Sequence, residues 1–147
     1  MVGAQFQAQL DTIMRSIDAQ VESRGYRVSN EMRNAVINTL RGQGSGRIYR
    51  VPMTKRYYQA SAPGEVPANR TGIYRMSWRP STYVSGMGGG LTVVSQVETT
   101  YRVGKGKYIL GELLENGTSR MAPRPHVDKI TEEAEKRAMR IYREPYF

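Results

Sequence analysis

A stiff turn late in the chain limits the folds open to it more than any other feature. The stretch LENGTSRMAPRP, residues 114–125, contains an Asn-Gly pair that accepts positive φ and two prolines that fix φ and remove two backbone donors. Such a segment is neither a helix nor a central strand. The residues after it have a helical pattern, so we predict a rigid turn that leads into a last helix.

Apolar residues in the N-terminal part recur at spacings of three and four, which is typical of one face of a helix about five turns long. We expect Gly25 to end this helix and Ser29 to cap a second one that stops before Gly42. One long, kinked helix is the alternative. Balanced charges on the outer face indicate helices packed on a core. The apolar face of the first helix consists of Phe6, Leu10, Ile13, Met14, Ile17 and Val21.

The remaining elements follow from alternation and from turn residues. Residues 81–109 read as strands, with alternation over residues 82–97, and predict an antiparallel hairpin linked by Gly88, Gly89 and Gly90. Residues 42–72 are rich in glycine and proline and predict a long loop without regular structure, followed by a helical turn over residues 73–78 that Pro80 stops. Gly117 suits the end of a short apolar helix.

A last helix is predicted from about Pro125 to Arg143, with an apolar face formed by Val127, Ile130, Ala134, Ala138 and Ile141. Together these elements predict an α+β fold in a single domain over residues 1–147. A small antiparallel sheet is packed by the N-terminal helix, or helix pair, and by the C-terminal helix. Residues 42–70 form an extended basic loop.

The composition gives little support to an enzyme. The chain has no cysteine and one histidine, which excludes thiol chemistry and the common zinc clusters. We expect His126 to be a partly exposed polar residue beside the turn, and we expect Asp11, Asp18 and the glutamates of residues 132–135 to be solvated charges. The sequence predicts no enzyme activity, no catalytic or metal-binding residue and no cofactor. With no apolar run approaching ~18 residues, we expect a soluble protein without membrane contact that is made in the cytoplasm.

The net charge of +9 is concentrated in one segment. Residues 41–79 contain eight Lys and Arg against one Glu, which gives +7, and tyrosines lie among the basic residues. Such a segment either contacts nucleic acid without sequence preference or buries its aromatic rings against the sheet or a neighbouring subunit. The candidate contact residues are Arg47, Arg50, Lys55, Arg56, Tyr57, Tyr58 and Arg70.

Two stretches resemble motifs of a known family. SAPGEVPANRTGIYRMSW, residues 61–78, is similar to a Pro-Gly, Pro and Thr-Gly segment of phage neck proteins, and LENGTSRMAPRPHV, residues 114–127, is similar to the Leu-Glu-x-Gly-Thr-Ser motif of the same family. These are the head–tail joining or tail-completion proteins of tailed double-stranded DNA phages. The chain departs from the family at His126, where Phe is usual and packing beneath the turn is expected to weaken, and in a longer basic insertion.

The resemblance implies a virion structural protein, made in the host cytoplasm, whose subunits form a six- or twelve-fold ring. The ring would join the DNA-filled head to the tail, between portal-side connector proteins and tail-terminator or tail-tube proteins, and line or seal the channel for packaged double-stranded DNA. The turn residues expected at subunit or ring contacts are Glu115, Gly117, Thr118, Ser119, Arg120, Arg124 and Pro125.

Four alternatives stay open. The turn residues could serve only to start the last helix sharply, and the basic loop could contact an acidic neighbouring ring instead of DNA. The protein could also be a tail-terminator or minor tail protein, or a free nucleic-acid-binding module.

Overall fold

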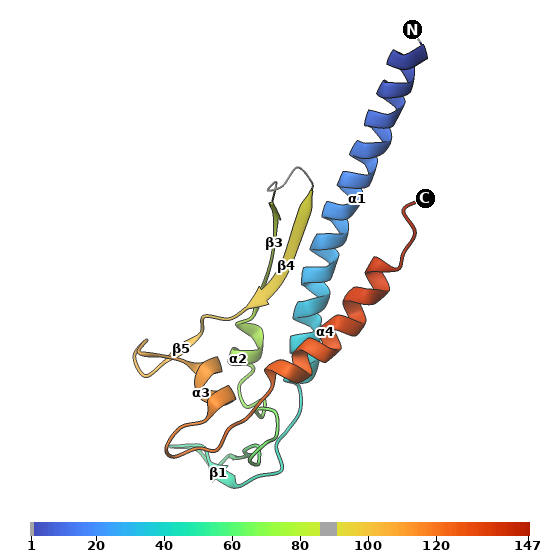
Figure 1. The fold of residues 1–147 in the computed structure, drawn as a ribbon. Coiled ribbons are helices and arrows are strands. Elements are labelled where there is room, and N and C mark those ends of the chain that lie inside the picture. The colour runs from blue at the N-terminus through green and yellow to red at the C-terminus, as the bar shows by residue number, and fades with distance from the viewer. Residues whose placement is uncertain (1, 86–90) are drawn as a thin grey trace.

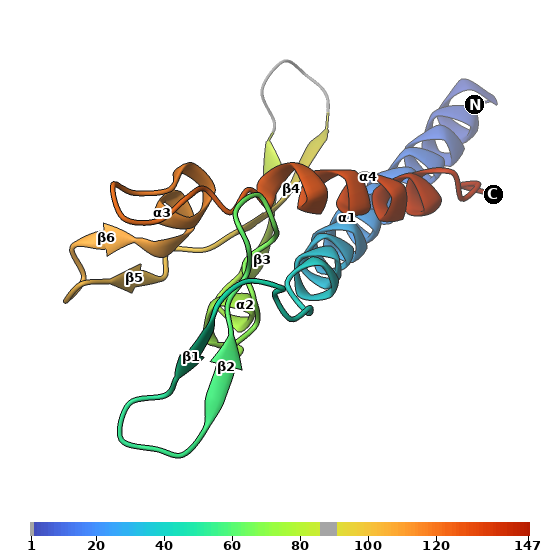
Figure 2. The same cartoon turned by 90° about the horizontal axis from the view of Figure 1, so that it is seen from below.

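The computed structural model describes residues 2–85 and 91–147. Within these residues the chain combines helices with short antiparallel hairpins, which confirms the predicted α+β class (Figures 1 and 2). The predicted sheet is divided into three two-stranded hairpins, β1–β2, β3–β4 and β5–β6. The elements are α1 (Val2–Thr39), β1 (Ile48–Arg50), β2 (Tyr57–Gln59), α2 (Ile73–Met76), β3 (Arg79–Ser85), β4 (Thr92–Glu98), β5 (Arg102–Val103), β6 (Tyr108–Ile109), α3 (Leu110–Asn116) and α4 (Val127–Tyr142).

The N-terminal part is one long helix, the alternative that the sequence left open. The prediction that Gly25 ends the first helix is wrong, because α1 runs through it and packs it against the β3–β4 hairpin. A side chain at this position would overlap the Cγ1 atom of Val93. The carbonyl oxygen of Gly25 accepts a hydrogen bond from Ser95 Oγ at 2.7 Å. Glycine is therefore placed here for close approach rather than for a helix end.

The predicted cap at Ser29 is also wrong. Ser29 lies inside α1 and is buried. Its hydroxyl donates to the carbonyl oxygen of Tyr26 at 2.9 Å and accepts a hydrogen bond from Thr82 Oγ1 at 2.9 Å. The small polar side chain thus helps to fasten β3 to the helix.

The β3–β4 hairpin is antiparallel, as predicted, with Tyr83 paired to Val94 and Pro80 paired to Val97. The glycine link predicted at Gly88, Gly89 and Gly90 lies outside the described residues. The predicted helical turn is α2, and Pro80 stands inside β3. Figure 1 shows this hairpin lying along the middle of α1.

The core lies where the C-terminal half of α1 meets α4 and β4. Val36, Leu40 and Ile130 are buried together, and partly buried Tyr74 and Trp78 pack against them. On α4 the predicted face is buried at Ile130, Ala134 and Ile141, whereas Val127 at its start is 43% exposed. The predicted last helix is confirmed, except that its apolar face begins one turn later than expected.

Residues 144–146, which follow α4, bind the middle of α1 at the end of the α1–α4 contact that lies away from Leu40. The guanidinium of Arg27 donates to both carboxylate oxygens of Glu144, at 2.7 and 2.6 Å. Buried Arg24 donates to the carbonyl oxygen of Pro145 at 2.9 Å and lies over the ring of Tyr146. These contacts hold the two helices side by side.

Residues 2–16 of α1, which we call the arm, extend beyond the rest of the protein (Figure 1). All of them are exposed. The sequence predicted that this face packs on a core, and this is wrong for Phe6, Leu10, Ile13 and Met14, which are 64%, 41%, 47% and 54% exposed. A contiguous exposed apolar stripe of this kind is unusual on monomeric proteins.

We predict that Gly25→Ala destabilises the protein by about 1–3 kcal/mol, even though alanine favours helices over glycine by up to ~1 kcal/mol. The added methyl group meets the stiff side chain of Val93, so the hairpin has to shift away from α1. Gly3→Ala in the same helix is the control, because nothing lies within 4 Å of its Cβ position. Urea denaturation measures both, and equal midpoints for the two variants would contradict the assigned packing.

Candidate functional site

The expectation that no part of residues 114–125 is helical is wrong for residues 114–116, which are the last three of α3. The turn begins at Gly117. Gly117 has φ 76° and ψ 179°, a conformation that is essentially restricted to glycine, and its N–H donates to the carbonyl oxygen of Leu113 at 2.9 Å. The predicted helix end at Gly117 is therefore confirmed. Beyond it, the N–H of Thr118 donates to the carbonyl oxygen of Met121 at 2.8 Å and closes a tight turn.

Glu115 connects this turn to the last helix. Its Oε2 atom accepts hydrogen bonds from the backbone N–H groups of His126 at 2.9 Å and Val127 at 3.2 Å. These are donors at the N-terminus of α4 that have no partner within the helix, and a carboxylate is favoured there by the helix dipole. Glu115 thus has a structural role within the fold.

His126 is buried, with 1% of its surface exposed, so the expectation of a partly exposed residue is wrong. Its Nδ1 atom lies 2.9 Å from the carbonyl oxygen of Arg124 and 3.1 Å from Glu115 Oε2. Both oxygens accept, so Nδ1 carries a proton, and in the neutral imidazole Nε2 then accepts from the hydroxyl of Tyr74, which lies 2.8 Å away. Burial raises the pKa of the Tyr74 hydroxyl, which keeps it a donor.

The histidine also fills the place beneath the turn. Its ring packs edge-on against Tyr74 and Trp78, with centroids 5.8 and 6.4 Å apart. The expected weakening of packing is therefore wrong, because the imidazole occupies an aromatic position and satisfies both nitrogens. The burial of His126 depends on Tyr74 and Trp78, which lie about fifty residues away in the sequence. The one sequence signal for a packed ring here was the resemblance to a motif that has Phe at this position.

The predicted contact residues of the turn fall into two groups. Thr118, Ser119 and Arg120 are exposed at its tip. Arg124 instead is half-buried and bonded within the protein: its Nε donates to Ser61 Oγ at 2.8 Å and one terminal nitrogen donates to the carbonyl oxygen of Ala122 at 2.8 Å. The residues that belong to the framework of the turn are Glu115, Gly117, Arg124 and half-buried Pro125.

The basic loop contains regular structure that its sequence did not indicate. β1 and β2 pair with Tyr49 opposite Tyr58, and their rings stack at 5.6 Å. The guanidinium of Arg70 lies 4.3 Å from the centre of the Tyr58 ring, which is a cation–π contact. The prediction of an irregular loop is therefore wrong over residues 48–59, although the segment still projects from the body of the protein (Figure 2).

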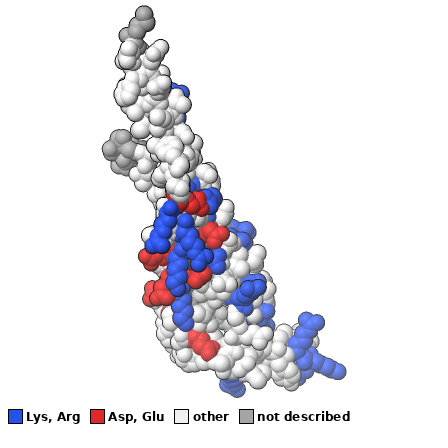
Figure 3. Space-filling view, turned by 90° about the vertical axis from the view of Figure 1, so that its right-hand side faces the viewer, with Lys and Arg blue, Asp and Glu red and all other residues white. Residues whose placement is uncertain are grey.

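The β1–β2 hairpin carries exposed cations from its base to its tip. Arg47, Arg50, Lys55 and Arg56 are all exposed, and Tyr57 is 66% exposed. Arg50 donates to the carbonyl oxygen of Thr54 at 2.8 Å, which shapes the tip. Figure 3 shows Lys and Arg standing out at the lower end of the molecule, whereas charges of both signs mix over its middle.

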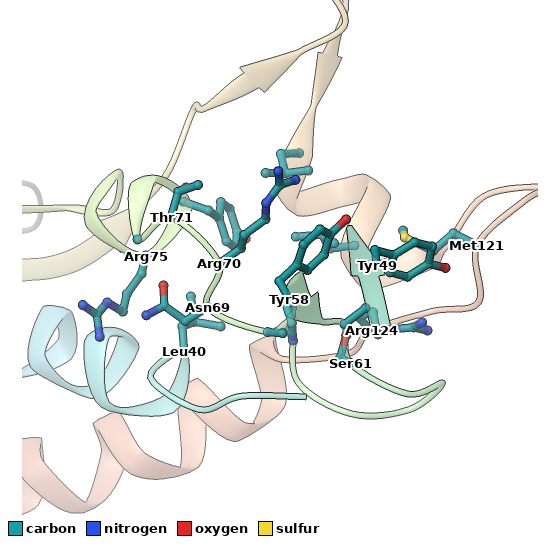
Figure 4. A pocket seen from close by; sticks show the side chains of 17 residues that line it. Leu40, Tyr49, Tyr58, Ser61, Asn69, Arg70, Thr71, Arg75, Met121 and Arg124 are labelled. Carbon is teal, nitrogen blue, oxygen red and sulfur yellow. Dashed lines mark hydrogen bonds between the residues drawn. The ribbon is translucent and has the colours of Figure 1, made fainter. Parts of the chain in front are cut away.

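A groove of about 520 Å³ joins the hairpin to the turn (Figure 4). Tyr49, Tyr58 and Arg70 line one part of it, and Met121 and Arg124 from the turn line another. Of the predicted contact residues, the groove brings together Tyr58, Arg70 and Arg124. The other predicted residues of the hairpin and of the turn do not line it. The sequence did not single out Ser61, Asn69 and Met121, because their place in the groove depends on how the segments meet.

Glu65 fixes the base of the hairpin. Its carboxylate accepts hydrogen bonds from the hydroxyl and the N–H of Ser45 and from the N–H of Ala62. These bonds, with that from the Ser45 hydroxyl the largest, lower the pKa of Glu65 from 4.5 to about 2. The single acidic residue of the basic segment thus closes the loop on which the hairpin stands.

The groove presents cations and aromatic faces, which suit an anionic or planar partner. Among the described residues, no three His, Asp or Glu side chains gather closely enough to hold a metal ion. Both ring nitrogens of His126 are engaged inside the fold. None of the helices in the described ranges has an apolar stretch long enough to cross a membrane.

We predict that Gly117→Val destabilises the protein by at least ~2 kcal/mol. Its Cβ would lie 2.8 Å from the Met121 oxygen and from the Pro123 nitrogen, and both are backbone atoms that cannot move independently. Gly42→Val is the control, because nothing lies within 4 Å of its Cβ position. Thermal unfolding measures both, and an unchanged melting temperature for Gly117→Val would contradict the turn geometry.

We predict that the base of the hairpin loosens in acid. The folded state holds the pKa of Glu65 below its unfolded value, so its stabilisation is complete above pH 4.5 and is lost as the pH falls from 4.5 towards about 2. Glu65→Gln should loosen the loop already at neutral pH. Hydrogen exchange at the Ser45 and Ala62 amides measures this; equal protection in variant and wild type would show that the carboxylate does not hold the loop.

Comparison of the chain with protein-family models, with curated proteins and with solved structures finds no match. What the groove and the turn can do therefore follows from their own geometry and charge.

Proposed function

We propose that this protein is a virion structural subunit of the phage neck, which forms a ring that joins the DNA-filled head to the tail and lines or seals the DNA channel. The observation that carries the proposal is the presence of two surfaces without partners at opposite ends of one small domain. An apolar arm projects at one end and a cationic hairpin at the other (Figure 1). Such surfaces suit a component that is completed by neighbours.

The motifs of residues 61–78 and 114–127 support the same proposal. In the folded chain they meet, because Arg124 donates to Ser61 Oγ and the N–H of Gly64 donates to the carbonyl oxygen of Pro123 at 3.1 Å. Together they form the framework from which Thr118, Ser119 and Arg120 reach solvent. A turn that is already rigid loses little entropy when it docks on an adjacent ring.

The positive charge of the β1–β2 hairpin suits contact between the ring and DNA. Residues 47–59 carry four basic residues and no acidic one, and a ring multiplies this +4 by the number of subunits. A hairpin that faces the lumen therefore surrounds the DNA with positive charge. Contacts of this kind go to phosphates and do not depend on base sequence. A tail-terminator or minor tail protein would present the same surfaces from a neighbouring ring.

A free nucleic-acid-binding module is a second candidate, favoured by exposed Tyr57 among the hairpin cations. Light scattering of the purified protein, with and without a DNA duplex, separates the two. A closed oligomer with weak DNA affinity supports the neck subunit. A monomer that binds DNA tightly at low salt supports the free module.

We predict that replacing Arg47, Arg50, Lys55 and Arg56 with alanine leaves folding intact and impairs DNA retention in assembled particles. Binding of the isolated protein to duplex DNA should weaken, and the magnitude of the slope of log affinity against log salt should fall by up to ~3.6, because each of the four phosphate contacts contributes about 0.9. Replacing Lys107, Lys129, Lys136 and Arg143 removes the same charge elsewhere and is the control. Infectious, DNA-filled particles from the hairpin variant would rule the role out.

A further inference from the structure

A second groove, separate from the one beside the turn, lies between α1, α4 and β4. It has a volume of about 360 Å³ and is lined mainly by apolar side chains. Thr131 and Glu135 are its polar residues, and Ala134 and Ala138 are small enough to let another helix approach closely. The larger lining residues are Met32, Trp78, Val97, Val127 and Ile130. We call this the α4 groove.

The arm presents a ridge that suits such a groove. Phe6, Leu10 and Ile13 are spaced by four and three, so they follow one line along the helix. At 3.6 residues per turn, Asp11 and Arg15 lie on the other side. The ridge is therefore flanked by uncharged residues, as expected for a helix that inserts into an apolar groove.

The arm cannot reach the groove of its own subunit. Met32 lines the groove and belongs to the same unbroken helix as Phe6. At 1.5 Å per residue the two are roughly 39 Å apart. The arm points away from the core (Figure 1), so the occupant has to come from another molecule.

Other occupants fit less well. A helix that lies on a lipid surface carries Lys and Arg along its polar face, whereas the arm has Arg15 alone. Pairing of two arms as a coiled coil needs three or four heptads, but the run of Phe6, Leu10, Ile13 and Ile17 covers fewer than two.

We infer that the arm of one subunit docks in the α4 groove of a second copy of this chain. This inference rests on the proposed function and names the contact through which its ring is built. Because each subunit gives an arm and receives one, the contact is head-to-tail and closes into a ring or continues as a filament. It uses a different part of the molecule from the turn and the hairpin.

The natural absence of cysteine allows a direct test by disulfide cross-linking. One cysteine is placed on the arm, at Phe6, Leu10 or Ile13, and one in the groove at exposed Thr131. We expect at least one double variant to give a ladder of linked subunits on oxidation. A mixture of the matching single variants should give linked pairs only. Cross-linking of an arm variant with itself, or no cross-linking in any combination, would overturn the inference.

A second test uses charge. Leu10→Asp places a carboxylate on the ridge and should raise the dissociation constant of self-association at least ~100-fold. Ala8→Asp places it on the opposite side of the same exposed helix and is the matched control. Ala138→Glu should block the groove. In a mixture of the two variants, the intact arm of Ala138→Glu can dock in the intact groove of Leu10→Asp, so the mixture should give pairs. If two arms paired with each other instead, Ala138→Glu would have no effect on self-association.

The outcomes separate this inference from the proposed function. Rings that persist with Leu10→Asp overturn the docking of the arm and leave the neck role in place. Loss of rings in Leu10→Asp, together with pairs in its mixture with Ala138→Glu, supports both the docking of the arm and the neck role. Binding of the arm to lipid vesicles without cross-linking overturns the inference in favour of a membrane surface.

Discussion

The packing of the β3–β4 hairpin against Gly25 is the contact on which the rest of the structure depends. It requires a residue without a side chain in the middle of a long helix, and it brings Thr82 and Ser95 within hydrogen-bonding distance of the helix backbone. With this hairpin in place, Val97 and Trp78 complete the core formed by α1 and α4. The arm, the α4 groove, the turn and the β1–β2 hairpin are all attached to this packed unit.

His126, beneath the turn, connects this packed unit to the turn through hydrogen bonds. His126 connects Tyr74 of α2 to the backbone of the turn, and Glu115 connects α3 to the start of α4. The turn and the groove beside it are therefore held by part-buried hydrogen bonds within the protein. A partner that docks there meets a surface that is already shaped.

Sequence patterns revealed the longer helices and strands but not which segments pack against them. Periodicity identified α4 and the β3–β4 hairpin, because each buries one face and repeats its apolar residues accordingly. It misjudged Gly25 and the arm, since a glycine or an apolar stripe looks the same whether a distant segment covers it or not. The β1–β2 hairpin has strands of three residues, too short to show alternation. The burial of His126 depends on residues about fifty positions away.

The continuity of α1 has a consequence for how the arm behaves before it meets a partner. An isolated peptide of this length would hardly be helical in water, because starting a helix costs more than extending one. Here residues 24–36, packed against the hairpin and α4, supply a permanent nucleus, and the arm only has to propagate from it. Order therefore spreads outward from the core into the exposed segment, and its tip frays first.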